Sequence, residues 1–209
     1  SLRILRSLVL PFALGTAAAL PAATQAAGPA YQQPIDELDP SLQVSNDVVE
    51  LAGWVIASGD NASHPFAIID KKAGQILVFD AAGRSRGLGP ALLGSAIGDH
   101  SAPGVAESAL KDIPLEDRTT PAGRFIAAYG PALGGETALW VDYDSAVSIH
   151  PLSTTAPEEK RPERLATPTP EDNRITQGRI HVSTNFDESE IRPAVGTGGL
   201  FDIGAAEQA

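Results

Sequence analysis

Histidines are the side chains of this 209-residue sequence best suited to proton transfer near neutral pH. Together with Asp142 and Asp144, the histidines provide side chains of the types that bind metal ions. No two histidines have a close ligand spacing such as His-x-x-x-His. The four histidines are His64, His100, His150 and His181. We expect no metal site, and we interpret Asp142 to Asp144 as the end of a strand and its turn.

His150 ends an alternating apolar segment and is followed at once by Pro151, so a strand gives way to a loop at this point. Functional side chains are often placed where a rigid scaffold meets a loop. The sequence leaves two interpretations open. His150 is either a structural histidine with its hydrogen bonds satisfied or part of a site.

The chain contains no cysteine, which excludes disulfides, thiolate metal sites and a cysteine nucleophile. A net charge of −11 leaves no basic surface for phosphates, so we expect no nucleic-acid partner, and an anionic membrane surface is also disfavoured. With 43% hydrophobic and 20% charged residues, the composition is that of an ordinary globular protein. The length favours one domain.

The amino terminus has the pattern of a secretory signal peptide. Arg3 and Arg6 precede an apolar run over residues 7–20, and small residues then lead to Ala26. We therefore expect residues 1–26 to be cleaved and the protein to be exported, either to a periplasm or outside the cell. An uncleaved amphipathic anchor is the alternative. No other segment approaches the roughly 20 apolar residues of a membrane span.

Residues 27–62 are expected to form a lead-in segment followed by one helix. The helix is predicted over residues 46–58, with Ser45 as its N-cap and Gly59 as the start of its stop signal. Apolar residues recur along it at helical spacing, so one face should be buried. Trp54 is expected to pack near that face.

Beyond Pro65 the pattern changes to short strand-like runs separated by Gly- and Pro-rich turns. The predicted strands lie near 66–70, 75–80, 86–90, 123–129, 138–142, 147–150, 178–182 and 200–203. The first two form a hairpin. Many short strands and few helices indicate an all-β sandwich or barrel with helical additions. The segment from Pro151 to Pro170 is rich in proline and charge, which predicts a long surface loop.

Thr119-Thr120-Pro121-Ala122-Gly123-Arg124-Phe125 contains the pattern Thr-Pro-x-Gly-x-Phe, and other segments surround it in a recognisable order. They are the hairpin at 66–79, Ser148-Ile149-His150, the segment 173–182 and the closing segments 185–191 and 196–203. In this order they resemble L,D-transpeptidases of the YkuD type, which cross-link peptidoglycan through a cysteine nucleophile. The resemblance implies a domain over residues 63–206. It also implies a mainly β fold, a sandwich of mixed sheets with a few helices, preceded by an N-terminal helix.

This chain departs from the family pattern in its chemistry. In the family a thiolate attacks a tetrapeptide stem, and the resulting acyl group passes to an amine on a neighbouring stem. Here Arg179 occupies the signature cysteine position, His181 stands where Asn or Arg is usual, and Gln177 stands where histidine is frequent. A guanidinium stays protonated and has no free lone pair, so it cannot attack. The resemblance therefore predicts a degenerate site of His150, Gly178, Arg179 and His181, with no catalytic residue assigned.

A relocated hydroxyl is the alternative nucleophile, and Thr176, Ser183 and Thr184 flank the signature. On a strand, Ser183 is displaced from position 179 by about 13 Å at roughly 3.3 Å per residue. Thr176 points to the other face or lies in the preceding turn. The spacing disfavours this alternative.

The substitution instead offers anion binding, because the fork of Arg179 can hold a carboxylate of a stem peptide by two hydrogen bonds. His150, His181, Gln177 and Thr176 complete the expected ligand-binding set. We expect an exported cell-wall protein without transpeptidase activity or cofactor, which binds peptidoglycan stem peptides or a cell-wall enzyme. Three alternatives remain: an Arg179 that pairs with an acidic side chain in a decayed site, an active transpeptidase or stem-peptide hydrolase, and a periplasmic scaffold with no cleft ligand.

Overall fold

A computed structural model describes residues 44–132, 135, 137–152, 156–196 and 198–203. The predicted signal peptide 1–26 lies outside these ranges, and so does the lead-in up to residue 43, so both remain predictions. Within the described ranges, no helix is both long enough and apolar enough to cross a membrane.

Helix α2 (Asn46–Ser58) has the predicted boundaries and ends at Gly59, whose φ of +68° is left-handed and suits glycine. Ser45 is the N-cap residue, but its hydroxyl makes no capping hydrogen bond, and its backbone N–H instead donates to Asp70 Oδ2 at 2.6 Å. The expectation for Trp54 is wrong. Its side chain is 53% exposed, with the Cζ atom of Arg124 5.9 Å from the ring centroid.

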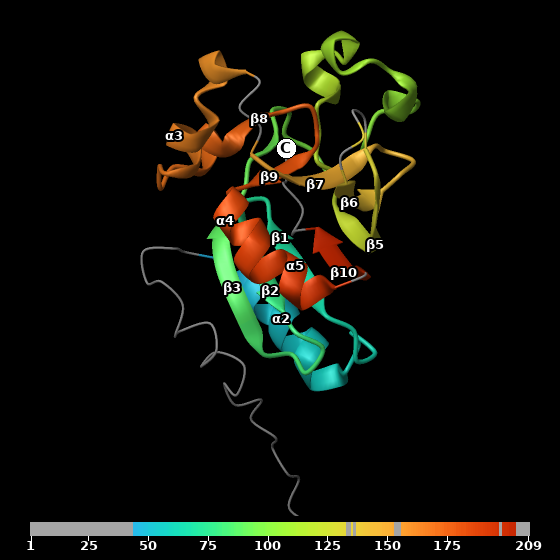
Figure 1. The fold of residues 1–209 in the computed structure, drawn as a ribbon, viewed down its shortest axis with the longest axis vertical. Helices are drawn as coiled ribbons and strands as arrows, with labels where there is room; N and C mark the ends of the chain where they lie inside the picture. The colour runs from blue at the N-terminus through green and yellow to red at the C-terminus, as the bar shows by residue number, and fades with distance from the viewer. Residues whose placement is uncertain (1–43, 133–134, 136, 153–155, 197, 204–209) are drawn as a thin grey trace, which may run out of the picture.

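The predicted mainly β fold with mixed sheets is confirmed, and eight strands form one large sheet (Figure 1). Across the sheet the order is β3 (Ser85–Pro90), β2 (Gln75–Phe79), β1 (Phe66–Asp70), β10 (Gly198–Ile203), β5 (Gly123–Pro131), β6 (Thr137–Asp142), β7 (Val147–Pro151) and β9 (Ile180–Val182). The pairs β1–β10 and β7–β9 are parallel, whereas their other neighbours are antiparallel. Each of these strands lies within two residues of its predicted bounds.

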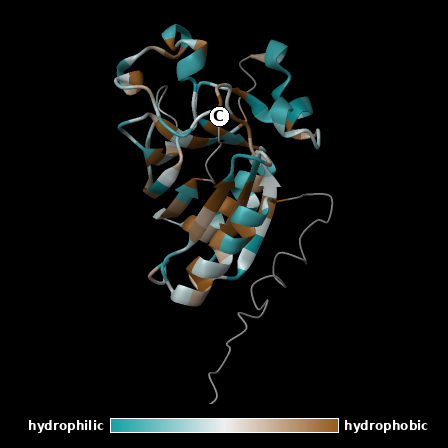
Figure 2. Cartoon of the chain, turned by 180° about the vertical axis from the view of Figure 1, so that it is seen from behind, coloured by the Kyte–Doolittle hydropathy of each residue, from teal (hydrophilic) through white to brown (hydrophobic). Residues whose placement is uncertain are grey.

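Two apolar clusters lie on opposite faces of the β1–β2 half of the sheet. The main cluster joins residues of β1 and β2 to residues of β5, β6, β7 and β9, so the twisted sheet covers one core from two sides, as in a sandwich. On the other face, α2 packs against Phe66 and Phe79, whose rings stack at 4.5 Å. Figure 2 shows the apolar residues gathered on these strands. Each large apolar side chain that is fully buried here contributes about 1.5–3 kcal/mol.

A helical segment near the carboxyl end closes the main core. It runs through α4 (Thr184–Phe186), the π-helical turn η6 (Asp187–Ile191) and α5 (Arg192–Val195). Ile191 and Val195 are both buried in the main cluster. In Figure 1 this segment lies across the sheet from α2, so the β1–β2 half is covered on both faces.

Two segments that connect strands of the sheet lie on opposite sides of the end that carries β7 and β9 (Figures 1 and 2). The 97–118 segment contains three short 3₁₀ helices: η1 (Val105–Glu107), η2 (Leu110–Asp112) and η3 (Leu115–Asp117). The 156–173 segment contains η4 (Pro157–Glu159), α3 (Arg161–Leu165) and η5 (Pro170–Asn173). A small parallel sheet pairs β4 (Leu93–Gly94), which precedes the 97–118 segment, with β8 (Arg174–Thr176), which follows the 156–173 segment.

The predicted surface loop from Pro151 to Pro170 is more ordered than expected. Arg161 and Leu165 are buried in it. The reason is a set of side-chain hydrogen bonds to backbone carbonyls, which the composition does not reveal. Arg164 donates from Nε to the carbonyl of Glu159 at 2.9 Å and from Nη1 to that of Asp172 at 3.0 Å.

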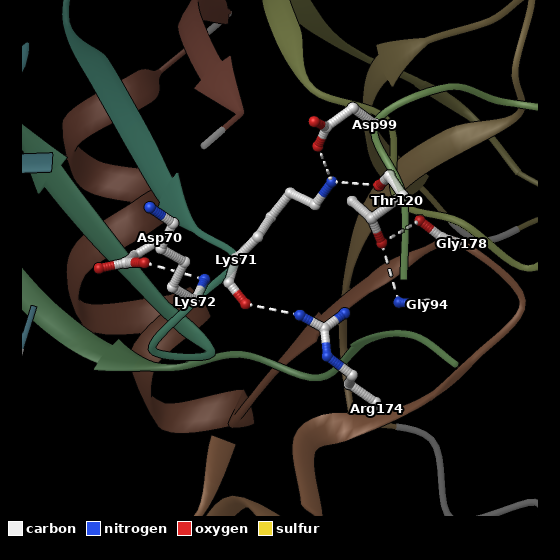
Figure 3. Close-up of polar contacts among 9 residues, drawn as sticks. Asp70, Lys71, Lys72, Gly94, Asp99, Thr120, Arg174 and Gly178 are labelled. Carbon is white, nitrogen blue, oxygen red and sulfur yellow. Dashed lines mark hydrogen bonds and ion pairs between the residues drawn. The ribbon is translucent and has the colours of Figure 1, made fainter. Parts of the chain in front are cut away.

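Lys71, in the turn after β1, connects the large sheet to the 97–118 segment (Figure 3). Its side chain is 1% exposed, and Nζ donates to the Gly98 carbonyl at 2.5 Å and to Asp99 Oδ1 at 2.8 Å. Burial lowers the pKa of Lys71, and the hydrogen bond to Asp99 opposes that shift. The carbonyl of Lys71 accepts from Arg174 Nη2 at 2.7 Å, which brings in β8 as well.

We predict that Lys71→Met lowers the free energy of unfolding by about 3 kcal/mol, because it leaves the partly buried Asp99 carboxylate and the Gly98 carbonyl without their cation. Lys72→Met is the matched control. Lys72 also pairs with a carboxylate, Asp47 at 2.6 Å, but both side chains are exposed, so its removal should change stability little. Urea denaturation measures both, and equal losses would contradict the structural role given to Lys71.

Candidate functional site

His150 and His181 lie side by side at the end of the large sheet. They are register partners on the parallel strands β7 and β9, and their rings stack with centroids 5.6 Å apart. Both therefore point to the same face, opposite the core face that holds Ile149 and Ile180. The structure thus brings together two of the residues predicted for the site.

His181 is uncharged at neutral pH. The residue is 8% exposed, and its pKa is lowered from 6.5 to about 3, chiefly by burial. Positive charge on Arg161, His150 and Arg179 contributes to the same shift. Arg161 Nη1 lies 3.5 Å from His181 Nε2, and Arg161 is itself paired with Glu159 Oε2 at 2.5 Å. His181 can therefore serve as a neutral donor or acceptor beside an anion, but not as a cation.

The turn before β9 is held by two threonine hydroxyls. Thr176 Oγ1 donates to the Arg179 carbonyl at 2.5 Å and accepts from the Gly178 N–H at 3.2 Å. Thr120 Oγ1 donates to the Gly178 carbonyl at 2.9 Å and accepts from the Gly94 N–H at 2.8 Å (Figure 3). The turn is therefore fixed directly by the Thr-Pro segment found in the sequence.

Gly178 is required at its position for two reasons. Its φ of +108° is a conformation that side chains disfavour, and a Cβ atom there would lie 2.7 Å from the carbonyl oxygen of Thr119. Any other residue would push the turn away from the Thr119–Thr120 segment. The next residue is Arg179, so the same contact sets where its side chain begins.

Arg179 is a half-buried cation with no anion beside it among the described residues. Its Nε atom is buried and makes no hydrogen bond, and in the part of the chain that the structure describes its guanidinium forms no ion pair. Burial alone lowers the pKa of Arg179. The expected alternative, in which Arg179 pairs with a nearby acidic side chain, finds no support among the described residues.

Arg179 and Gln177 line a small cavity of about 100 Å³. Its opposite wall comes from the 97–118 segment, with Val105, Leu110 and Ile113 among the apolar residues there. The cavity thus combines one cationic group with a mostly apolar wall. Such a space suits a small anion that carries a short apolar group.

The three hydroxyls considered as replacement nucleophiles are occupied elsewhere or exposed on a helix. Thr176 makes the turn hydrogen bonds, Ser183 Oγ caps α4 by accepting from the Phe186 N–H at 3.2 Å, and Thr184 is exposed on α4. The hydroxyl beside His150 belongs instead to Ser148, with 2.7 Å between Oγ and Nε2. Ser148 has no exposed surface, so this pair lacks access to a substrate.

Sequence reasoning missed three contributors to the site: Ser148, Arg161 and the apolar wall near Val105. Ser148 could have been found from strand alternation, because it lies two residues before His150 and residues two apart on a strand share a face. Arg161 carries no such signal, because it lies in a proline-rich segment without periodicity. For metal binding, the described residues contain no group of three or more His, Asp or Glu side chains placed to hold an ion.

Comparisons with known proteins give structural likenesses only. The sequence matches no protein-family model, and no curated protein matches it significantly. The chain is similar to the helical cell shape determining protein Pgp2 from Campylobacter jejuni, with a TM-score of 0.46 and 14% identity over 69% of this chain and 49% of Pgp2. It is also similar to L,D-transpeptidase 1 from Mycobacterium tuberculosis, with a TM-score of 0.38 and 16% identity over 68% of this chain and 62% of that one. This chain thus covers less than two thirds of either protein.

The pKa of His181 predicts a specific acid sensitivity. Between pH 6.5 and about 3 the unfolded chain binds a proton that the folded protein excludes, so this residue lowers stability as the pH falls through that window. At pH 5 the effect amounts to about 2 kcal/mol. We predict that His181→Asn reduces the stability difference between pH 7.5 and pH 5 by about this amount.

Urea denaturation at the two pH values measures that difference without depending on the absolute stability of the variant. His64→Asn is the control, because His64 is exposed and lies outside the site. A pH dependence that is unchanged in His181→Asn would show that His181 titrates normally in the folded protein.

Proposed function

We propose that this chain is an exported, L,D-transpeptidase-like cell-wall protein that has lost transpeptidase chemistry and binds carboxylate-terminated peptides of the peptidoglycan-stem type. The observation that carries the proposal is Arg179, a half-buried guanidinium without a partner among the described residues, which stands at the position of the family's nucleophile and lines a small cavity. The segment order and the Thr-Pro motif support the choice of ligand class. A cell-wall enzyme that presents such a carboxylate is the other partner consistent with this site.

The energetics of Arg179 favour a ligand. A buried charge without a partner is costly, and a carboxylate is the group whose geometry matches the guanidinium fork. Arg161 does not compete for the ligand, because it already pairs with Glu159. His181 is neutral and Arg179 is the cation that lines the small cavity, so Arg179 is the group proposed to attract an anion there.

Loss of catalysis follows from the same residues. The chain has no cysteine anywhere, and arginine has no lone pair for attack. Acyl transfer needs an accessible nucleophile beside a base. The Ser148–His150 pair has the right chemistry for a hydroxyl enzyme, which is the observation in favour of the active alternative, but Ser148 is completely buried.

We predict that Arg179→Ala weakens binding of a disaccharide tetrapeptide by about 10- to 100-fold, the loss expected for hydrogen bonds to a charged group. Arg179→Lys should restore the affinity only in part, because an ammonium lacks the planar fork. Calorimetric titration gives both affinities. Arg86→Ala is the control, since Arg86 is exposed on β3, away from the cavity.

Thermal unfolding of the same variants separates binding from structure. Since the Arg179 guanidinium makes no hydrogen bond or ion pair in the described part of the chain, Arg179→Ala should keep or slightly raise the melting temperature. Equal affinity of wild type and Arg179→Ala would overturn the proposed ligand contact. Absence of binding to the wild type would favour the scaffold alternative.

We also predict that the purified protein shows no turnover of tetrapeptides and no covalent mass increase with a carbapenem, a reagent that acylates the family's cysteine. Intact-mass spectrometry measures the adduct, and product analysis measures turnover. An adduct mapped to Ser148, Thr176, Ser183 or Thr184 would establish a hydroxyl nucleophile. Loss of that adduct in the corresponding alanine variant would confirm the assignment.

A further inference from the structure

An open cavity of about 790 Å³ lies away from Arg179, at the start of α2. Its size falls in the range of about 300–1,000 Å³ typical of small-molecule sites. Three parts of the chain line it: the start of α2 with Ser45, the β1–β2 turn with Gln75, and the 156–173 segment with Asn173. It shares no lining residue with the cavity at Arg179.

The walls of this cavity are held in place by hydrogen bonds within the protein. Asp70 Oδ1 accepts from the N–H groups of Lys72 and Ala73, each at 3.0 Å, which fixes the β1–β2 turn. Asn173 Nδ2 donates to the Gly74 carbonyl at 2.9 Å and ties the 156–173 segment to that turn. The cavity is therefore largely preformed.

Each wall contributes one buried polar atom without a partner in the described part of the chain. These atoms are Ser45 Oγ, Gln75 Oε1 and Asn173 Oδ1. Gln75 is 8% exposed and Asn173 is 3% exposed, so neither amide is an ordinary surface group. Most buried polar side-chain atoms in native proteins are hydrogen-bonded. Nine atoms in the described part of the chain are exceptions, and three of them belong to residues that line this one cavity, which favours a polar ligand there.

The chemistry of the walls defines the ligand class. All three atoms accept hydrogen bonds and none is charged, while Lys72 Nζ is already paired with Asp47. An extended peptide is disfavoured, because β2 is paired on both sides and the edge residue Pro90 has no N–H to offer. A ligand with several hydroxyl donors and apolar ring carbons fits this set of groups.

We propose that this cavity binds a neutral sugar. Ring hydroxyls donate to Ser45, Gln75 and Asn173, and the apolar side of the sugar packs on Leu165 and Pro168. Because the three acceptor atoms are buried, the side chains of Ser45 and Gln75 turn toward the ligand on binding, a rotamer change that is common at binding sites. Asn173 reaches the ligand by a small movement that keeps its hydrogen bond to the Gly74 carbonyl. This site is independent of the ligand proposed for Arg179.

Calorimetric titration of the full chain with the trisaccharide of N-acetylglucosamine and with maltotriose tests the proposal. We expect saturable binding of at least one of them, and preference for the first would identify an N-acetylated amino sugar. Combining Ser45→Ala with Gln75→Leu should weaken binding by about tenfold or more. The fold should tolerate these changes, because Ser45 Oγ and Gln75 Oε1 have no partner among the described residues.

Ser85→Ala is the matched control, because Ser85 Oγ is also buried without a partner but lies outside the cavity. Its affinity for the sugar should equal that of the wild type, and so should that of Arg179→Ala. Ala166→Trp, placed on an exposed part of the wall, should block the cavity and abolish binding. Failure of both trisaccharides to bind would overturn the proposal, as would equal affinity of the double variant and the wild type.

Discussion

The arrangement of the site depends on the contacts that the buried ammonium group of Lys71 makes with Gly98 and Asp99. Lys71 lies where the β1–β2 hairpin, the 97–118 segment and β8 meet, and its side chain and carbonyl contact all three. A charge with 1% exposure is costly unless it is fully paired, which is why Gly98 and Asp99 are held close to it. Without this contact, the wall of the Arg179 cavity would lose the hydrogen bonds that join it to the hairpin turn.

Four cationic side chains are buried or half-buried in a protein whose net charge is strongly negative. Lys71, Arg161, Arg174 and Arg179 are buried or half-buried, and the first two are paired with carboxylates. Arg174 binds the Lys71 carbonyl. Arg179 differs from the other three in having no such contact among the described residues. His181 stays neutral chiefly because it is buried, and the nearby charges of Arg161 and Arg179 add to that effect.

The strands of the large sheet were predictable because each one shows alternation or a short apolar run between Gly- or Pro-containing turns. The small sheet was not, since β4 and β8 contribute two and three residues, too few for a pattern. Trp54 was expected near the buried face of the helix but is exposed. Helical spacing alone does not show whether a residue lies on the buried face or at its edge. Arg161 and the 97–118 wall depend on contacts between distant segments, which local patterns do not encode.

The shape of the turn before β9 and the chemical character of position 179 depend on different residues. The turn before β9 needs Gly178 for its backbone and Thr120 and Thr176 for its hydrogen bonds, and none of these three contacts uses the side chain at position 179. The residue at position 179 can therefore vary without loss of the turn. Its side chain lines the cavity between the turn and the 97–118 segment, so it sets the charge of that cavity, whereas Gly178, Thr120 and Thr176 set the shape of the turn.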